Sequence, residues 1–486
     1  MEYKITGCKP EKLFHFFEDI SAIPRASKNE KALSDYLVKF AEERGLWVYQ
    51  DDIHNVIIKK AGSKGAEDKA PVMLQGHLDM VCEKRSGVDH DFETEGLELI
   101  VKDGVLSANG TTLGSDNGVA VALMMTVLDD EELEHPPIEC VFTTQEEIGL
   151  NGASALDKSQ ITARTMINMD SEEEGVATIS CAGGLRIELT RNIERTQAEG
   201  TLVQVKIEGL LGGHSGMDIN KERQNANLMM ARMAAHLMDQ TNGMLVSFAG
   251  GTKDNAITRE CEMTLLYTDK AEAEKAEKLA CDLAEVFADE ISSIEPDYSC
   301  EVAVTENQSA AVIKAEDSKA LISLIRLAPI GVYRRNIKMD GFVVVSSNMG
   351  VVRTSEDEMF IAIAPRSSVA SFQEDTKSRF ALLADTFGFE IAYRGEYPGW
   401  SYAEKSEIRD IFVESYKDLF GTDLKLEAIH AGLECGLFSD AIPGLDAIAV
   451  GPTLNDVHTP DESAPLDSLE RFYELLKDVL SRLARA

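Results

Sequence analysis

The chain has 486 residues, of which 44% are hydrophobic and 27% charged, so we expect about two or three domains with sizeable cores. Its net charge of −36, from 48 basic and 84 acidic residues, argues against nucleic-acid binding and against attachment to anionic membranes. The cysteines form no C-x-x-C pair, the first residues lack the layout of a signal peptide, and no segment approaches a run of about 18 apolar residues, so we expect a cytoplasmic protein with reduced thiols.

The first 185 residues alternate between helical and strand patterns. The predicted elements are helices at 10–20 and 28–45, two strands and a turn at 48–60, a strand at 72–76, a helix at 117–129, and strands at 138–143 and 165–169. Such alternation predicts an α/β fold with a mixed, mostly parallel sheet flanked by helices. In such sheets ligands gather at the carboxyl ends of the strands.

From about residue 186 the pattern changes to hairpins and charged helices. The predicted elements are a strand at 202–207, a helix at 225–238, a strand at 256–267, helices at 270–291 and 317–327, strands at 342–352 and 359–364, a helix at 370–387 and a strand at 389–393. The fragments that begin at Asn255 and Asn348 are loosely alike. We interpret 186–394 as an inserted α+β domain, and two related halves, about 186–300 and 301–394, are one explanation of this likeness. Chance similarity between two ordinary hairpins is the other.

The first pattern returns after residue 394. The predicted elements are a helix at 405–420, a glycine-rich turn at 430–436 that leads into a short helix, a strand at 446–450 and a closing helix at 466–484. We expect this segment to complete the sheet begun by residues 1–185. The domain formed by 1–185 and 395–486 is then discontinuous in sequence.

Two adjacent carboxylates, Glu146 and Glu147, follow the apolar run 138–144. Neighbouring carboxylates repel unless a positive charge lies beside them, and a divalent metal would supply it. Both can reach one site only where the backbone bends, as Gly149 and Gly152 suggest. One glutamate can then bind the metal while the other takes a proton from water on it. A solvated acidic pair at a helix start is the alternative.

A second polar strand end is His77-Leu-Asp79. Residues two apart on a strand face the same side, so Asp79 can lie next to His77. A metal-bound imidazole usually donates its other N–H to a carboxylate, which fixes its tautomer. The pair therefore suits a metal ligand and its orienting acid, although a surface histidine beside an incidental aspartate explains this motif alone equally well.

Further segments also end in acidic or imidazole side chains. Asp116 lies between glycines at the start of an apolar helix, where by itself it is more typical of an N-cap than of a ligand. Asp170 directly ends an apolar strand. His458, in a Pro-containing loop, is one candidate for a late ligand, and His430 is the other. Carboxylates and imidazoles together are what zinc, manganese or cobalt accept.

In chain order, His-x-Asp, Gly-x-Asp-x-Gly, Glu-Glu-x-Gly, a strand-end Asp and a late His resemble the dinuclear-zinc peptidases, the family of carnosinases, aminoacylases and glutamate carboxypeptidases. The strings Gly-His-Leu-Asp-Met, Gly-Gly-His-Ser-Gly and Ile-His-Ala-Gly-Leu-Glu-Cys-Gly are similar to its aminoacyl-histidine dipeptidase branch, the peptidase D type. The likeness extends over nearly the whole chain. Ser-Asp-Asn-Gly in place of the more usual Asp-x-Lys-Gly sets the chain apart from the aminoacylase and deacetylase branches.

The resemblance implies a role for each ligand candidate. Asp116 would bridge two metals. His77 and Asp170 would complete one metal site, and Glu147 and His458 the other.

The resemblance also implies catalytic and substrate-binding residues. Glu146 would be the general base, Asp79 would orient the metal-bound histidine, and His214 of the inserted lid domain would stabilise the oxyanion. The peptide bond between Asp116 and Asn117 is expected to be cis. The candidates for binding the substrate are Arg366, Asn255, His430 and Gly432, the first two through its C-terminal carboxylate and backbone.

The implied function is that of a cytoplasmic metallo-dipeptidase. It would hydrolyse Xaa-His and related, unspecific dipeptides with a hydroxide that bridges two divalent ions, zinc in the first place and cobalt or manganese otherwise. Its partners would be dipeptide substrates, with no nucleic acid and no membrane, and the chain would be a monomer or a homodimer. The alternatives are an N-acyl amino acid amidohydrolase of the same family and a catalytically inactive metal-binding protein.

Overall fold

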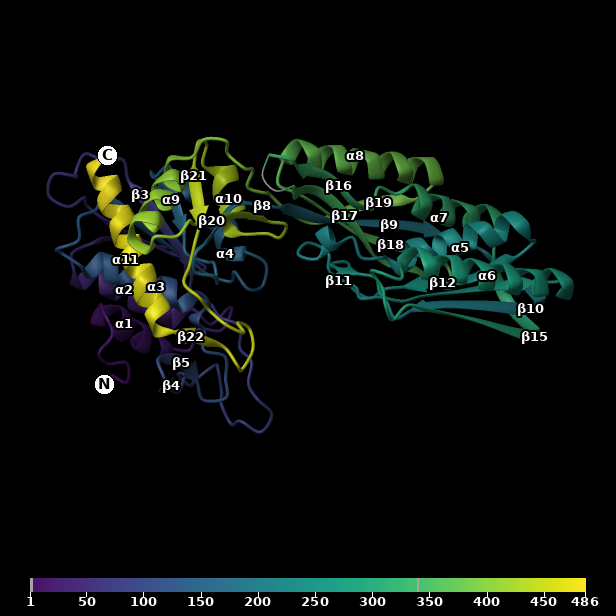
Figure 1. Cartoon of the computed structure of the whole chain (residues 1–486), viewed down its shortest axis with the longest axis horizontal. Coiled ribbons are helices and arrows are strands. Elements are labelled where there is room, and N and C mark those ends of the chain that lie inside the picture. The colour runs from purple at the N-terminus through teal and green to yellow at the C-terminus, as the bar shows by residue number, and fades with distance from the viewer. Residues whose placement is uncertain (1–2, 339–340) are drawn as a thin grey trace. The chain divides into compact units, whose positions relative to one another are not determined.

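The computed structural model describes residues 3–338 and 341–486, which form two compact units (Figure 1). The first unit comprises Met1–Cys181, Tyr402–Ala428 and Leu433–Ala486, and the second comprises Ala182–Ser401 and Ile429–Gly432. The unit boundaries differ by a few residues from the predicted limits of 185 and 395, because β9 (Gly183–Asn192) already belongs to the second unit and β19 (Glu390–Tyr397) still does. The short return of the chain to the second unit at Ile429–Gly432 has no signal in the sequence.

An eight-stranded mixed sheet in the order β1-β2-β6-β3-β7-β21-β8-β20 forms the centre of the first unit. Its strands are β1 (Trp47–Gln50), β2 (Val56–Lys60), β3 (Val72–His77), β6 (Ile138–Thr143), β7 (Thr165–Asn168), β8 (Val176–Cys181), β20 (Lys425–Ile429) and β21 (Asp446–Ala449). Strands β6, β3, β7 and β21 run parallel, whereas β1, β2 and β8 pair antiparallel with their neighbours. The predicted α/β class with a mixed sheet is confirmed, and the parallel strands form its centre.

Helices and a small second sheet complete the first unit. They are α1 (Glu11–Ser21), α2 (Lys31–Glu43), α3 (Ser115–Asp129), α4 (Asn151–Ala155), α9 (Glu407–Phe420), α10 (Glu434–Ala441), α11 (Leu466–Arg485), and the strands β4 (Leu99–Lys102), β5 (Val105–Ala108) and β22 (Ser463–Pro465). Helix α3 is apolar on all sides and is buried from Ser115 to Leu128, as is typical of a helix enclosed by a core. The amphipathic α1 instead buries one face, including Phe14 and Phe17, in the same core.

The parallel strands bring their carboxyl ends to one edge of this sheet. Strand β3 ends at His77, the chain after β6 continues to Glu146, and the chain after β7 continues to Asp170. The register pairs His77 with Thr143 of β6, so the neighbouring strands end at the same level. This edge therefore gathers three of the predicted ligand segments.

A nine-stranded antiparallel sheet forms the second unit, in the order β15-β10-β14-β12-β17-β18-β9-β19 with β16 beside β17. Besides β9 and β19, its strands are β10 (Arg195–Glu208), β12 (Met244–Gly250), β14 (Cys261–Tyr267), β15 (Ser299–Ile313), β16 (Gly331–Asn336), β17 (Phe342–Thr354) and β18 (Glu358–Ser367). The helices that lie along this sheet in Figure 1 are α5 (Ala226–Gln240), α6 (Lys270–Ile291), α7 (Ala315–Leu327) and α8 (Ala370–Phe387). Their apolar residues share one core with the sheet. A short pair, β11 (Gly213–His214) and β13 (Ala256–Ile257), lies outside it.

The strand order repeats within the second unit. The set β10-α5-β12-β14-α6-β15 gives the order β15-β10-β14-β12, and the set β9-α7-β17-β18-α8-β19 gives the same order from the opposite edge. The two sets meet where β12 pairs with β17. Two related halves remain a prediction. With this strand order, one half would comprise residues 195–313, and the other would comprise 183–192 together with 315–397. The sequence-based limits of the halves were about 186–300 and 301–394.

Within residues 3–338 and 341–486, no helix is long and apolar enough to cross a membrane.

Candidate metal centre

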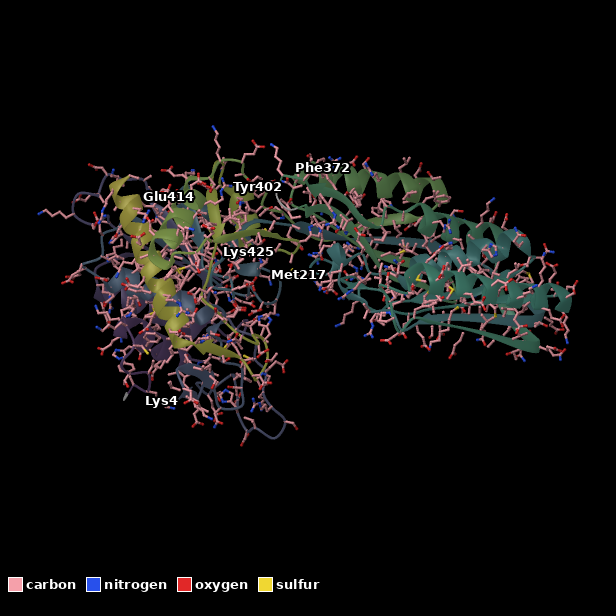
Figure 2. All side chains as sticks on the ribbon, in the orientation of Figure 1. Lys4, Met217, Phe372, Tyr402, Glu414 and Lys425 are labelled. Atoms are coloured by element: carbon pink, nitrogen blue, oxygen red, sulfur yellow. The ribbon has the colours of Figure 1, made fainter. Side chains whose placement is uncertain are left out.

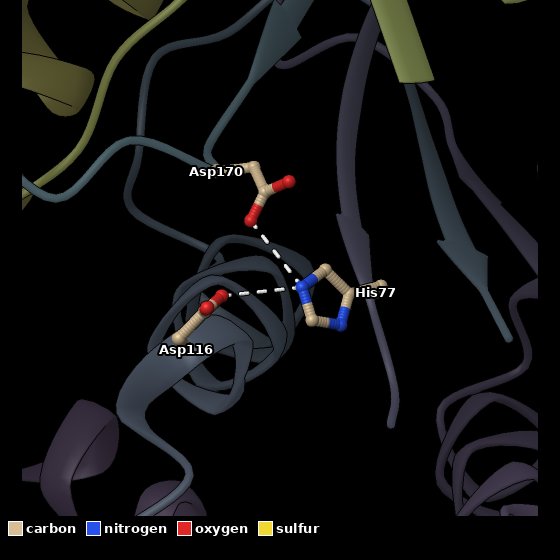
Figure 3. Close-up of side chains that lie close together, drawn as sticks. All are labelled: His77, Asp116 and Asp170. Carbon is tan, nitrogen blue, oxygen red and sulfur yellow. Dashed lines mark hydrogen bonds and ion pairs between the residues drawn. The ribbon is translucent and has the colours of Figure 1, made fainter. Parts of the chain in front are cut away.

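The predicted metal ligands lie together in the first unit. Three overlapping groups have ligand atoms within 4.8 Å of one another: His77, Asp116 and Asp170; His77, Glu146 and Glu147; and Asp116, Glu147 and His458. In Figure 3, Asp116 and Asp170 both point at the same ring nitrogen of His77. The three groups share members, so they form a single cluster.

Asp116 faces a different histidine with each carboxylate oxygen. Its Oδ1 lies 3.2 Å from His77 Nε2, and its Oδ2 lies 3.0 Å from His458 Nε2. At the first end Asp170 Oδ1 lies 3.3 Å from His77 Nε2, and at the second Glu147 Oε1 lies 3.1 Å from His458 Nε2. Each end of the cluster thus has one histidine and one carboxylate of its own, and Asp116 joins the ends.

The exit from β3 fixes the orientation of His77. Its Nδ1 lies 3.0 Å from the backbone oxygen of Asp79 and 3.5 Å from the Asp79 carboxylate. An Nδ1–H donated there leaves Nε2 as the nitrogen that can bind a metal. The backbone N–H of His77 donates to Asn117 Oδ1, which ties β3 to the start of α3. The Asp116–Asn117 peptide bond is cis, as predicted.

Asp79 also holds the glutamate turn. Its carboxylate accepts hydrogen bonds from Ser27 Oγ at 2.7 Å, Glu146 N at 3.0 Å and Glu147 N at 3.3 Å. Burial opposes its ionisation, but the hydrogen bonds from His77, Ser27 and the Glu146 N–H outweigh burial and lower the pKa of Asp79. The buried Asp79 carboxylate therefore orients the predicted ligand His77. It also holds the backbone N–H groups of Glu146 and Glu147, whose side chains belong to the cluster.

The bend predicted at Gly149 and Gly152 is present. The backbone oxygen of Glu146 accepts hydrogen bonds from Gly149 N at 3.0 Å and Leu150 N at 2.9 Å, which closes a turn. A Cβ at Gly152 would lie 2.1 Å from Thr144 O, so only glycine fits there. Within the described ranges no residue forms a hydrogen bond or ion pair with the Glu146 carboxylate, whereas the Glu147 carboxylate faces His458.

The cluster carries more negative charge than its surroundings can compensate. Burial together with neighbouring carboxylates raises the pKa of Glu146 to about 9 and also raises the pKa of Glu147 and Asp170. Hydrogen bonds to Asp116 and Glu147 raise the pKa of His458 to about 10. Divalent cations would relieve this repulsion, and the nitrogen and oxygen donors fit zinc, cobalt or manganese.

A second group of predicted residues lies in the second unit around Arg366. This side chain is 9% exposed, and its guanidinium donates to Tyr397 Oη at 2.9 Å and Ser215 Oγ at 3.5 Å, while Nε has no partner in the described part of the chain. Among residues 3–338 and 341–486, no carboxylate forms an ion pair with it. Arg366 and Asn255 line a hollow of about 270 Å³.

His214 and His430 belong to this second group. His214 Nδ1 accepts hydrogen bonds from Gly216 N at 3.3 Å and Met217 N at 3.1 Å, so its Nε2 carries the proton. The neighbouring Met217 is labelled in Figure 2. Burial and the Arg366 charge lower the pKa of His214 and bring that of His430 to about 3, so both rings are neutral.

His430 Nε2 lies 2.7 Å from Ser346 Oγ, so this ring takes part in the second group and not in the metal cluster. Of the two candidates for the late ligand, the cluster contains His458. A Cβ at Gly432 would lie 2.8 Å from the Tyr397 ring, so a larger residue at this position would clash with the ring.

Comparison with known proteins identifies the family. The model of peptidase family M20/M25/M40 matches residues 73–482. The chain belongs to this family. It is 34% identical to the cytosol non-specific dipeptidase of Escherichia coli (strain K12) over 485 residues, 99% of either chain. Aminoacylhistidine dipeptidase from Vibrio alginolyticus matches 99% of this chain with 98% of its own, at 35% identity and a TM-score of 0.95. Aminopeptidase PepT from Bacillus cereus, at 17% identity and a TM-score of 0.55 over 98% of this chain and 99% of its own, shares the fold.

Family membership, predicted from the motifs, is thereby confirmed, but sequence reasoning missed a buried polar group behind the metal cluster of this M20 peptidase. Glu434 is fully buried and accepts hydrogen bonds from Thr143 Oγ1 at 2.8 Å and from Gln75 Nε2, and its Oε1 has no partner among the residues that the structure describes. Burial raises the pKa of Glu434 to about 7. Its only signal was its place in the glycine-rich string, which does not reveal that the carboxylate packs against β3 and β6.

Proposed function

We propose that this M20 peptidase is a cytoplasmic metallo-dipeptidase that hydrolyses Xaa-His and other dipeptides with two divalent ions, preferably zinc. The observation that carries the proposal is Asp116, whose two oxygens face two histidines, each accompanied by a further carboxylate. The relatives that match almost the full chain are a cytosol non-specific dipeptidase and an aminoacylhistidine dipeptidase, which supports the substrate class and the compartment.

The two ends of the cluster would each hold one ion. His77 and Asp170 would bind the first, Glu147 and His458 the second, and Asp116 both. When bound, such ions polarise the scissile carbonyl and increase the acidity of water. Asp79 keeps the His77 ring in the orientation and tautomer that this role requires.

Glu146 is suited to move the proton. Its carboxylate is the one of the glutamate pair without a hydrogen-bond partner among residues 3–338 and 341–486, and the turn at Gly149 holds its backbone. Without cations burial raises the pKa of Glu146 to about 9, and positive charge nearby would lower this pKa. Glu146 would then take a proton from water and give it to the leaving amine.

His214 and Arg366 would bind the substrate. The neutral His214 ring presents an Nε2–H, which is the donor that a developing oxyanion needs. Arg366 is a buried guanidinium without an anionic partner among the described residues, and its planar fork matches a carboxylate. A free C-terminal carboxylate on the substrate would supply that partner, with Asn255 contributing at the same hollow.

A substrate panel tests this proposal. The protein would be stripped of metal, reloaded with zinc, cobalt or manganese, and assayed on Xaa-His dipeptides, other dipeptides, tripeptides and N-acetyl amino acids. We expect the dipeptides to be hydrolysed fastest. Faster turnover of N-acetyl amino acids would identify an amidohydrolase instead, and bound metal without turnover of any substrate would identify a catalytically inactive protein.

A further inference from the structure

The backbone that carries Asp116 is held by a buried carboxylate from a distant part of the first unit. Glu462 is 2% exposed, and within the described ranges its carboxylate accepts five hydrogen bonds, all from residues 113–116. Oε2 accepts from Leu113 N at 2.7 Å and Gly114 N at 2.9 Å. Oε1 accepts from Ser115 N at 2.8 Å, Ser115 Oγ at 2.6 Å and Asp116 N at 3.4 Å.

Glu462 takes the place of a helix cap. The N-cap of α3 is Gly114, with φ at 63°, and it has no side chain to accept the free N–H groups. These N–H groups and the helix dipole favour a negative charge at this position. Because Glu462 supplies that charge, the carboxylate of Asp116 does not have to cap its own helix and can face His77 and His458.

Arg25 holds the same segment from its other side. This guanidinium is also buried, and it donates to Gly114 O and, at 3.0 Å, to Leu78 O. A Cβ at Gly114 would lie 2.4 Å from Arg25 Nη2, so the segment and the guanidinium are closely packed. The backbone around Gly114 is therefore held by two opposite charges. Its N–H groups bind the Glu462 carboxylate, and its carbonyl oxygen binds the Arg25 guanidinium.

The loop that provides Glu462 also provides His458. Glu462 N donates to Thr459 O at 3.1 Å, and Asn455 and Ser463 exchange backbone hydrogen bonds across the loop. His458 has φ at 62°, a left-handed conformation that costs energy for a residue other than glycine and must be maintained by its surroundings. One loop thus provides the proposed metal ligand His458, and its Glu462 hydrogen-bonds to the backbone that carries the other ligand, Asp116.

We propose that Glu462 is a positioning residue of the metal centre, which fixes Asp116 and His458 relative to each other so that one carboxylate can serve two ions. The inference rests on the proposed two-metal function. Glu462 hydrogen-bonds to the Asp116 segment and lies outside the three ligand groups, so its loss should weaken metal binding and leave the binding of the dipeptide almost unchanged.

Two substitutions and one control test the role of Glu462. Glu462→Gln keeps the shape but replaces an acceptor oxygen with an NH₂ group that faces N–H donors, and Glu462→Asp keeps the charge on a shorter side chain. Glu139→Gln is the matched control, because Glu139 is 3% exposed and accepts hydrogen bonds from Thr162 N at 2.9 Å and Ala163 N at 3.0 Å. It lies near the start of β6, at the end of the strand away from the glutamate turn.

Zinc affinity would be measured on the folded full-length proteins by competition with a chromophoric chelator, beside KM for a dipeptide at saturating zinc. We expect Glu462→Gln to weaken binding of at least one ion by about tenfold or more, as for residues that orient metal ligands, with a smaller loss in Glu462→Asp. The KM of Glu462→Gln for the dipeptide should change by less than about twofold. The zinc affinity of the control Glu139→Gln should also stay within about twofold of the wild-type value.

A loss of less than about tenfold in Glu462→Gln, or an equal loss in Glu139→Gln, would overturn the inference. If Glu462→Gln does not fold, Glu462→Asp decides, and a zinc affinity within about twofold of the wild-type value would overturn it. Wild-type protein that binds no zinc would refute the proposed function and the inference together. Wild-type protein that binds about two ions, beside a Gln variant that binds them equally well, would refute the inference alone.

Discussion

Replacing Arg366 with methionine is expected to reduce dipeptide hydrolysis strongly without destabilising the protein. The guanidinium is buried, and among the described residues its partners are the neutral hydroxyls of Tyr397 and Ser215. A buried charge without an anionic partner does little for stability. We therefore expect Arg366→Met to keep the free energy of unfolding within about 1 kcal/mol of the wild-type value, or to increase it.

The expected loss of activity follows from the proposed contact between Arg366 and the substrate's carboxylate. Hydrogen bonds to charged groups contribute about 1.5–3 kcal/mol each, so losing a bidentate pair costs about 3–6 kcal/mol, or about 10²- to 10⁴-fold in kcat/KM. Arg366→Lys should fall between the two proteins, because lysine keeps the charge but loses the planar fork.

The assay compares a dipeptide with its C-terminal amide in the wild-type protein and in Arg366→Met. The wild-type enzyme should prefer the free acid by about the same 10²- to 10⁴-fold, and in the variant this preference should shrink to about fivefold or less. A variant that keeps the full preference for the acid would show that Arg366 does not bind the carboxylate. Circular dichroism and thermal unfolding of both proteins provide the control for folding.

Two further predictions concern the metal cluster. Glu146→Gln should keep its bound metal, measured by elemental analysis, while kcat falls by about 10²- to 10⁴-fold, and an unchanged kcat would refute its role as the base. In metal-free protein the pKa of His458 is raised to about 10 from 6.5 and that of Glu146 to about 9 from 4.5. Between pH 6.5 and 9 the folded chain therefore binds more protons than the unfolded chain, so stability falls as pH rises. Thermal unfolding in the presence of a chelator measures this, and a melting temperature that increases over the same range would contradict it.

Three of the predicted ligand segments were predictable because their signal is local. Each follows an apolar strand, and parallel strands end at the same edge of a sheet, so the sequence predicts that His77, the glutamate pair and Asp170 meet. The choice between His458 and His430 could not be made in this way. It depends on the return of Ile429–Gly432 to the second unit, and the residues around His430 carry no signal for that.

Contacts between distant parts of the chain were missed for a similar reason. Glu462 binds N–H groups 346 to 349 positions away, and a lone glutamate in a polar loop is indistinguishable in sequence from a solvated one. Strand β15 was missed because it is an edge strand with few buried residues, and its apolar residues Cys300, Val302 and Val304 are only partly buried against the core. The repeated strand order of the second unit depends on the pairing of β9 with β18, which spacing along the chain does not predict.

We propose that one cluster around Asp116 holds two ions and hydrolyses dipeptides. A titration of metal-free protein with zinc, in which the release of histidine from an Xaa-His dipeptide is followed, tests this proposal. Turnover should be absent without zinc and should reach its maximum at about two equivalents per chain. Full turnover in the absence of metal, or none at any zinc concentration, would contradict the account.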